Sequence, residues 1–230
     1  MGTFVVVVGG GPLPPPRPGS RRLADGPSCG ERPAAVIAVD SGLDIALAAG
    51  LTPTVLVGDL DSISTSGLEW ARRHGVRIEA HPADKDATDT ALALATTATL
   101  AASDASPRLH VLCGSATDRL DHLLGLLAAL GAPDLAAFRS VRIDVATTQL
   151  HVLHPGHEVV LALPRGHVFS LLSLHGTCAG VDVEAARWPL ADATLVAHST
   201  LGISNESTGV DVTVRCASGV LTVVVPEVAT

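Results

Sequence analysis

The sequence predicts an α/β domain with a mainly parallel, Rossmann-like sheet, followed by an all-β domain that is a sandwich or barrel. In the N-terminal part, short apolar runs alternate with helical stretches, as in a parallel sheet with crossover helices. From residue 149 onward the helical period disappears, and short alternating segments separated by turn residues replace it. We therefore divide the chain into residues 1–148 and 149–230.

The composition narrows the classes of function. The chain has 230 residues, of which 47% are hydrophobic, so it can bury a sizeable core and is not a disordered tail. Aromatic residues make up only 2% and the net charge is −8, which argues against a nucleic-acid partner. A nucleotide ligand stays compatible with this charge, because a bound divalent cation can bring its phosphates in.

Cysteine usage and hydropathy indicate the compartment. The four cysteines form no Cys-x-x-Cys pair and indicate neither a zinc site nor a disulfide framework. No apolar stretch approaches the roughly 20 residues that span a bilayer, and the N-terminal apolar run is too short for a signal peptide. We expect a soluble, cytoplasmic protein with no membrane partner.

The first two strands each end in a turn that carries candidate ligand groups. A β-branched run at residues 3–8 ends in Gly9-Gly10-Gly11, which is either a tight turn or a phosphate contact, and a Pro/Arg-rich loop follows at 12–33. A second apolar strand at 34–39 ends at Asp40. This carboxylate either caps the next helix, expected at 43–50, or contacts a ligand; the sequence favours neither.

The third strand, at residues 54–57, leads into the first acidic turn. Asp59 and Asp61 are two residues apart, so in extended backbone their side chains point the same way. Magnesium commonly takes one or two carboxylates together with substrate phosphates. The alternative is a turn in which an aspartate caps the helix that begins near Thr65.

A second acidic turn follows about twenty residues later. The elements around it are a helix, a strand and an alanine-rich helix, expected at 66–74, 76–80 and 90–100. Asp86 and Asp89 are three apart, which places them on one face in the first turn of a helix, where the macrodipole favours anions. A well-capped, solvated helix start would also explain Asp86. Lys85, the only lysine of the chain, lies among these carboxylates and suits a bound polyphosphate.

A third strand-to-helix junction combines charged and titratable groups. The apolar strand at 109–113 is followed by Arg119, Asp121 and His122, and a helix is expected at 120–130. A single histidine is more often structural than catalytic, but the Arg-x-Asp-His group at such a junction favours function. In open α/β sheets, ligands bind at the carboxyl ends of the strands.

The remainder of the chain is predicted to be strands. One strand, at 141–146, completes the first sheet. The alternating segments of the second domain lie at 157–163, 167–174, 181–184, 194–197, 210–216 and 220–225.

Several motifs together resemble those of the thiamine pyrophosphokinases. They occur in the order Val39-Asp40-Ser41-Gly42, Val57-Gly58-Asp59-Leu60-Asp61-Ser62, Asp84-Lys85-Asp86-Ala87-Thr88-Asp89, Arg119-Leu120-Asp121-His122, Arg187-Trp188-Pro189-Leu190 and Gly202-Ile203-Ser204-Asn205-Glu206. The resemblance covers nearly the whole chain from Ala34. Gly-Asp-x-Asp-Ser with Lys-Asp-x-Thr-Asp, in this order and spacing, is specific, whereas any one motif alone is not.

The resemblance implies an enzyme that transfers the pyrophosphoryl group of ATP to the hydroxyl of thiamine, releases AMP and requires Mg²⁺. It also implies an α/β nucleotide-binding domain, a C-terminal β-sandwich domain, and a homodimer with thiamine bound near the subunit interface. The alternatives are another Mg²⁺-dependent, ATP-using phosphotransferase or hydrolase, and a non-catalytic nucleotide-binding module. The C-terminal half would distinguish a thiamine pyrophosphokinase from another phosphotransferase, because the specificity for the acceptor is expected to reside there. A non-catalytic module would be expected to have lost some of the five carboxylates, all of which are present at Asp59, Asp61, Asp84, Asp86 and Asp89.

The resemblance assigns roles to individual positions. The acidic metal and catalytic positions correspond to Asp59, Asp61 and Asp89. The positions on the nucleotide side correspond to Asp40, Asp86, Thr88, Arg119, Asp121 and His122. The thiamine-side motif and aromatic position correspond to Ser204, Asn205 and Trp188, although a lone Trp is usually a core residue.

We combine these roles in one mechanistic hypothesis. Mg²⁺ binds Asp59 and Asp61, Asp89 orients or deprotonates the attacking hydroxyl, and Arg119 stabilises charge on the phosphates. The chain departs from the family at Ser41 and at Thr117-Asp118, where glycines are usual, and in the proline-rich loop. These departures put close backbone contact with the nucleotide in question at those turns.

Overall fold

The computed structural model describes residues 1–13, 32–114 and 119–227, which form two compact units. The first unit comprises Met1–Ala129 and Ile143–Ala146. The second comprises Leu130–Arg142 and the chain from Thr147 onward. The predicted boundary after residue 148 stays a prediction; in the structure, the stretch 130–142 belongs to the second unit.

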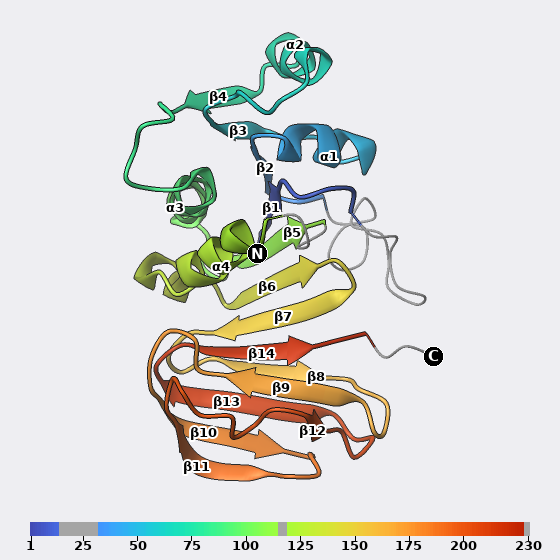
Figure 1. The fold of residues 1–230 in the computed structure, drawn as a ribbon, viewed down its shortest axis with the longest axis vertical. Coiled ribbons are helices and arrows are strands. Elements are labelled where there is room, and N and C mark those ends of the chain that lie inside the picture. The colour runs from blue at the N-terminus through green and yellow to red at the C-terminus, as the bar shows by residue number, and fades with distance from the viewer. Residues whose placement is uncertain (14–31, 115–118, 228–230) are drawn as a thin grey trace. The chain divides into compact units, whose positions relative to one another are not determined.

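A parallel sheet is the centre of the first unit (Figure 1). Its strands are β1 Thr3–Val8, β2 Ala35–Val39, β3 Val55–Gly58, β4 Arg77–Ala80, β5 Arg108–Cys113 and β6 Ser140–Val145. The order is β6-β5-β1-β2-β3-β4, and the pairs from β5 to β4 are all parallel. All parallel strands therefore end at one edge of the sheet, which confirms the predicted α/β domain with a mainly parallel sheet.

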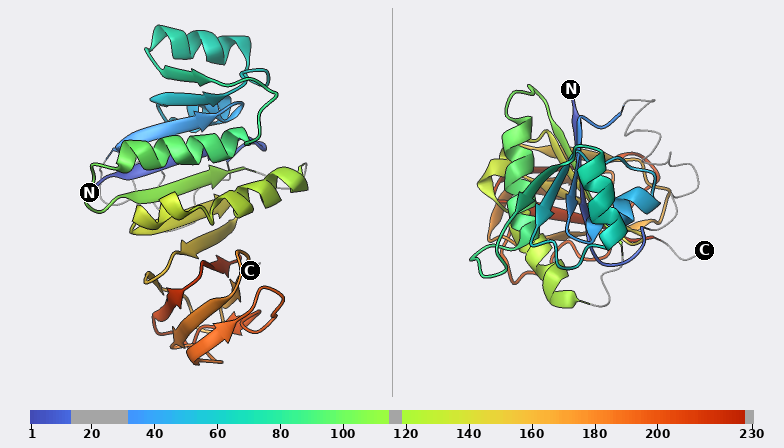
Figure 2. Two further views of the ribbon diagram at one scale, coloured as in Figure 1. Left: turned by 90° about the vertical axis from the view of Figure 1, so that its left-hand side faces the viewer. Right: turned by 90° about the horizontal axis from the view of Figure 1, so that it is seen from above.

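Helices cover both faces of this sheet. They are α1 Gly42–Ala48, α2 Thr65–Arg73, α3 Asp89–Ala101 and α4 Leu120–Ala129. Figure 2 shows α3 and α4 in front of the strands and α1 behind them. The α1 face buries Val5, Val7 and Val36 against Ala46, and Ala71 of α2 packs in the neighbouring cluster on Leu56. The helices thus shield the β-branched strand residues from water on both faces of the sheet, as a buried parallel sheet requires.

The second unit is an antiparallel sandwich. Its strands are β7 Thr148–Leu153, β8 Glu158–Leu161, β9 Val168–Leu172, β10 Cys178–Glu184, β11 Leu190–Leu195, β12 Asn205–Glu206, β13 Val212–Ser218 and β14 Leu221–Val225. Four of its strands are neighbours in the order β12-β9-β14-β7, as part of a ten-stranded sheet, and the other four form a separate sheet with the order β11-β10-β13-β8. Alternate residues of both sheets, among them Phe169, Val181 and Val223, form one buried cluster. This confirms the all-β prediction as a sandwich.

The sequence missed three elements. They are β7, the two-residue strand β12, and a 3-10 helix, η2, at Pro133–Ala137. The segment expected at 194–197 is shifted, because β11 lies at Leu190–Leu195. In the part of the chain that the structure describes, no helix is long and apolar enough to cross a membrane.

Candidate active site

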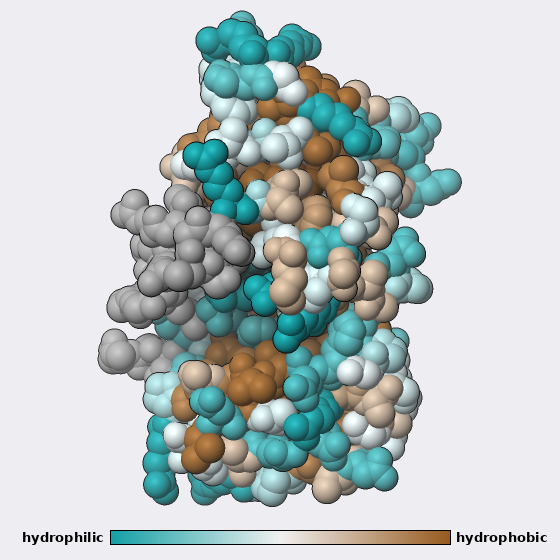
Figure 3. All heavy atoms as spheres, turned by 180° about the vertical axis from the view of Figure 1, so that it is seen from behind, coloured by the Kyte–Doolittle hydropathy of each residue, from teal (hydrophilic) through white to brown (hydrophobic). Residues whose placement is uncertain are grey.

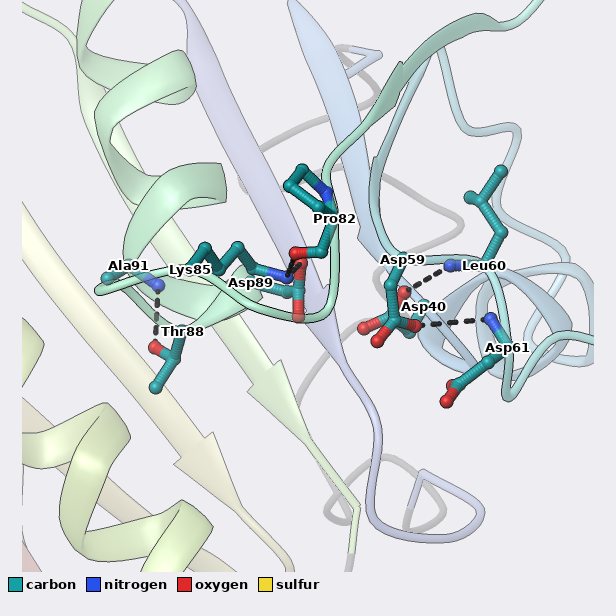
Figure 4. A network of polar contacts seen from close by, with 9 residues as sticks. All are labelled: Asp40, Asp59, Leu60, Asp61, Pro82, Lys85, Thr88, Asp89 and Ala91. Atoms are coloured by element: carbon teal, nitrogen blue, oxygen red, sulfur yellow. Dashed lines mark hydrogen bonds and ion pairs between the residues drawn. The ribbon is translucent and has the colours of Figure 1, made fainter.

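Four carboxylates and one lysine gather where β2, β3 and β4 end (Figure 4). We call this group the acidic edge; its members are Asp40, Asp59, Asp61, Lys85 and Asp89. Because β2, β3 and β4 are parallel neighbours, the turns that follow them lie side by side. Both acidic turns therefore lie at the carboxyl ends of neighbouring parallel strands, the edge at which ligands bind in open α/β sheets.

Asp40 follows β2 in a left-handed conformation, with φ 45°, and its carboxylate points at the first acidic turn. It accepts a hydrogen bond from the backbone N–H of Leu60 at 3.3 Å. Burial, and then the charges of Asp89, Asp59 and Asp61, raise the pKa of Asp40 to about 6. The helix-capping alternative is wrong, because the N-cap of α1 is Ser41, which makes no side-chain capping bond.

Gly58 makes room for the Asp40 carboxylate. A Cβ at this position would overlap Asp40 Oδ1, and the backbone has φ 152°, a region that side chains rarely adopt. Leu60 also has a positive φ, 69°. Strained backbone held in place by its surroundings tends to accumulate at functional sites. Sequence reasoning gave Gly58 and Leu60 no role; the only available signal was their position inside the Gly-Asp-x-Asp motif.

Asp59 and Asp61 form a carboxylate pair. The backbone N–H of Asp61 donates to Asp59 Oδ1 at 3.1 Å, and this bond is the main reason that the pKa of Asp59 is lowered. The pKa of Asp61 is raised, first by its side-chain contact with Asp59 and then by the charge of Asp59. Neither residue caps α2: Ser64 does, accepting from Gly67 N at 2.9 Å, so that alternative is also wrong.

The second acidic turn differs from the prediction in one respect. Asp86 is not in the first helical turn, because α3 begins at Asp89 with Thr88 as its N-cap. Thr88 Oγ1 accepts from Ala91 N at 3.2 Å and fixes the start of the helix after Asp86, so Asp86 and Asp89 do not share a helical turn. Asp86 lies exposed before the helix, in the turn that contains Lys85.

Lys85 reaches the carboxylate of Asp89. Its Nζ lies 2.9 Å from Asp89 Oδ1 and donates to Pro82 O at 3.0 Å. The Asp89 contact is the first cause of the raised pKa of Lys85. The lysine therefore partly neutralises the acidic edge and stays a cation there.

The third predicted group makes its own ion pair. Arg119 Nε and Nη2 donate to the two carboxylate oxygens of Asp121 at 3.0 and 2.7 Å, and both side chains are about two-thirds exposed. This contact lowers the pKa of Asp121 to about 2. His122 is exposed and lies in the first turn of α4, which begins at Leu120. The structure thus places these three residues at the carboxyl end of β5 as a separate charged group, and Thr117 and Asp118 lie outside the described residues.

The glycines of the first turn pack against neighbouring turns. A Cβ on Gly9 would lie 2.6 Å from Ser41 Oγ, and one on Gly114 would overlap the backbone of Gly11. Close packing accounts for glycine at Gly9 without a ligand. The departure at Ser41 needs no glycine conformation either, because its φ is −56°.

The second unit carries the remaining predicted residues. Trp188 is 50% exposed, so the expectation that it is a core residue is wrong. Leu201 and Ile203 are exposed as well, and Figure 3 shows such apolar residues at the surface of this unit. Ser204 is exposed, whereas Asn205 is only 2% exposed and is hydrogen-bonded to the backbone of Trp188.

The donor chemistry of the acidic edge fits magnesium. Its ligand atoms are carboxylate oxygens, the donors that Mg²⁺ prefers. The pKa of Asp40 is raised mainly by burial and that of Asp61 mainly by its side-chain contact with Asp59, and the charges of the neighbouring carboxylates add to both. In the described parts of the chain, no three Asp, Glu, His or Cys side chains converge as a metal cage. A pair of carboxylates is what Mg²⁺ needs when waters and phosphates supply its other ligands.

Family models match both units. The model of the thiamin pyrophosphokinase catalytic domain matches residues 30–143, and that of the vitamin B1 binding domain of the same enzyme matches residues 151–221. The chain belongs to the thiamin pyrophosphokinase family. The catalytic-domain match assigns it to the enzymes of that family, the thiamine diphosphokinases.

Individual relatives agree with this assignment. A thiamine pyrophosphokinase from Bacillus subtilis is 26% identical over 187 residues, which covers 80% of this chain and 84% of that protein. The fold is similar to a thiamin pyrophosphokinase family protein from Enterococcus faecalis, with a TM-score of 0.75 at 20% identity and full coverage of both chains. It is also similar to the thiamin pyrophosphokinase from Candida albicans, with a TM-score of 0.73 at 12% identity, covering 98% of this chain and 89% of that one.

Proposed function

We propose that this enzyme transfers the pyrophosphoryl group of ATP to the hydroxyl of thiamine in a Mg²⁺-dependent reaction that yields thiamine diphosphate and AMP. The observation that carries the proposal is the acidic edge, with four carboxylates and a lysine at neighbouring strand ends of a nucleotide-binding type of sheet. Transfer of this type depends mostly on positioning and charge neutralisation rather than on covalent chemistry by the protein.

Asp59 and Asp61 are the residues that would hold Mg²⁺. Their side chains follow one strand end and face the same space, and their carboxylates are exposed enough to accept a hydrated ion. When bound, the ion neutralises charge on the phosphates that the reaction moves. Asp40 adds negative potential from behind the pair, which favours a divalent over a monovalent cation.

Asp89 would act on the acceptor hydroxyl. It is the first residue of α3, and its carboxylate can accept a proton or a hydrogen bond from that hydroxyl. Lys85, held against Asp89, can turn its ammonium group toward phosphate oxygens without leaving the site. Thr88, Asp86 and the Arg119–Asp121–His122 group are proposed contacts on the nucleotide side.

Thiamine is proposed to bind to the second unit, consistent with the vitamin B1 binding domain match. Trp188 offers an exposed ring that suits the flat, cationic thiazolium by stacking and cation–π attraction. Ser204 is the exposed hydroxyl of the neighbouring motif. The exposed apolar residues around it are consistent with the homodimer proposed for this chain, since an interface of two copies would cover them.

The decisive experiment measures both products. Purified protein is incubated with ATP, Mg²⁺ and thiamine, and thiamine diphosphate and AMP are quantified over time. Equal amounts of the two support pyrophosphoryl transfer, and their loss on chelation with EDTA supports the Mg²⁺ requirement. ADP in place of AMP would contradict the reaction type, and ATP binding without either product would indicate another acceptor or a non-catalytic module.

A further inference from the structure

We infer that Asn205 is a positioning residue that holds Trp188 in place, rather than a residue that binds substrate. The inference rests on the proposed function, since the value of a fixed Trp188 ring lies in its proposed contact with thiamine. It reverses the role that motif position alone assigns to Asn205. Three observations carry it: the hydrogen bonds of Asn205, the anchoring of its own backbone, and the surroundings of the Trp188 ring.

Both the oxygen and the nitrogen of the Asn205 side-chain amide are bonded to backbone groups. Oδ1 accepts from Trp188 N at 3.1 Å and from Glu206 N at 2.8 Å, and Nδ2 donates to Trp188 O at 2.7 Å. The orientation of the amide is unambiguous, because two backbone N–H groups require the oxygen and one carbonyl requires the nitrogen. With 2% of the residue exposed, no part of this amide is presented to a ligand.

The two bonds to Trp188 act on a stretch that lies outside the named strands, where an isolated β-bridge between Ala186 and Ser207 also pairs the two segments. Residues 185–189 lie between β10 and β11 and are not part of either strand. Asn205 grips both the N–H and the C=O of Trp188, which sets the direction of that peptide segment. Beside it, Arg187 N donates to Glu206 O at 2.8 Å, so the two segments run together for consecutive residues.

The Asn205 end of this contact is firmly anchored. β12 pairs with β9, with Asn205 opposite Phe169, which is fully buried. Before it, Ser204 has φ 57° and its N–H donates to Ser170 Oγ at 3.0 Å. Asn205 therefore ties the loop 185–189, which leads into β11 of the other sheet, to the fixed backbone of β12 and β9.

The side chain of Arg187 packs over one face of the Trp188 ring. The guanidinium of Arg187 lies 4.6 Å from the ring centroid, and its Nη1 contacts both carboxylate oxygens of Glu206 at 3.0 Å. Half of the tryptophan stays exposed. A ring fixed at its backbone and backed by a cation is preorganised for a flat partner, which lowers the entropy lost on binding.

The chain offers a clean readout and a matched control. Its two tryptophans are Trp70 and Trp188, and Trp70 lies in the first unit, so a Trp70→Phe background reports Trp188 fluorescence alone. Asn205→Ala is compared with Ser207→Ala in this background. Ser207 is equally buried, at 3%, and its Oγ also makes two backbone bonds, to Leu163 O and from Gly209 N, but none to Trp188.

The expected result separates the two variants. Asn205→Ala raises the KM for thiamine on the order of tenfold, leaves the KM for ATP unchanged, and changes the emission maximum and anisotropy of Trp188. Ser207→Ala lowers thermal stability to a similar degree but changes neither the KM for thiamine nor Trp188 emission.

Two outcomes would overturn the inference. If Asn205→Ala raises the KM for thiamine while Trp188 emission and anisotropy stay as in the parent, Asn205 contacts thiamine directly. If Trp188 fluorescence responds equally to Asn205→Ala and Ser207→Ala, Asn205 has no specific hold on the ring. If the parent makes no thiamine diphosphate, the proposed function fails, yet the fluorescence comparison still decides whether Asn205 positions Trp188.

Discussion

The acidic edge of the first unit and the Trp188–Asn205 corner of the second unit treat their polar groups in opposite ways. At the acidic edge, Lys85 is the one cation that the described residues place beside Asp40, Asp59, Asp61 and Asp89, and the pKa of Asp40 is raised to about 6. At the corner, the amide of Asn205 is hydrogen-bonded to the backbone of Trp188, and Arg187 forms an ion pair with Glu206.

The acidic edge is therefore suited to reaction chemistry, whereas the corner is suited to holding a fixed structure. Uncompensated charges destabilise the folded state. In a site for a cation and phosphates, this destabilisation is offset only when those ligands bind. A satisfied polar network instead rigidifies its surroundings whether or not a ligand is present. Substitutions at the acidic edge should therefore abolish activity with little loss of stability, whereas those at the corner should act through structure.

The largest expected effect is at Asp89. Asp89→Asn keeps the size of the side chain and its place at the start of α3 but removes the base and the charge that holds Lys85. We expect kcat to fall about 10²- to 10⁴-fold, the range of general-base contributions, with an unchanged circular dichroism spectrum. Glu69→Gln, an exposed carboxylate on α2, is the control and should keep full activity. Near-normal turnover by Asp89→Asn would remove this residue from the mechanism.

The next effect is structural and tests the backbone of the acidic edge. Gly58→Ala places a Cβ on Asp40 Oδ1 at a backbone conformation with φ 152°. We expect a loss of about 2 kcal/mol in the free energy of unfolding, measured by urea denaturation, together with reduced activity, since Asp40 must move. Gly75→Ala is the comparison: it also has a positive φ, 68°, but no atom lies within 4 Å of its Cβ. Equal losses of activity in both variants would show that Asp40 packing is not the cause.

A smaller effect is expected from the pKa of Asp40. Its pKa is about 6 in the folded protein against 3.8 for the free side chain, so the folded state binds more protons between these values. Stability contributed by protonation is therefore present below pH 3.8 and is lost as pH rises through 6. Asp40→Asn should be more stable than the parent at pH 8 without Mg²⁺, by about 1 kcal/mol once the half-exposed position is allowed for.

Thermal unfolding at a series of pH values checks this prediction. The difference in Tm between Asp40→Asn and the parent should be largest above pH 6 and should shrink toward pH 4. Mg²⁺ should narrow the difference at pH 8 by stabilising the parent's carboxylates. A difference that is independent of pH would mean that the carboxylate of Asp40 is not the origin.

The two regions also differ in how far sequence alone could describe them. The acidic turns were predictable, because the apolar strand before Asp59 and the short strand before Lys85 place both turns at the ends of parallel strands, which lie at one edge of the sheet. The helix starts were harder to place, since several residues compete to cap them. Ser64 and Thr88 are the N-caps in the structure. Asp59 and Asp61 therefore cap no helix, and Asp86 lies before α3.

The corner could not be predicted because its contacts are long-range. Asn205 and Trp188 are 17 residues apart, and the two-residue strand β12 that brings them together has no period to detect. Motif position alone suggested that both residues face the substrate. Only the geometry separates the buried amide from the exposed ring, and with it the positioning role from the proposed binding role.

The smallest expected effect concerns the ion pair that backs the Trp188 ring. One nitrogen of Arg187 contacts both oxygens of Glu206, a weaker geometry than two parallel bonds, and the arginine is 60% exposed. Glu206→Gln should therefore cost at most about 0.5 kcal/mol in urea denaturation, and less in high salt than in low salt. In the Trp70→Phe background, the emission of Trp188 should change much less than in Asn205→Ala, because both backbone bonds to Asn205 persist. A larger shift from Glu206→Gln than from Asn205→Ala would mean that the cation, not the amide, fixes the ring.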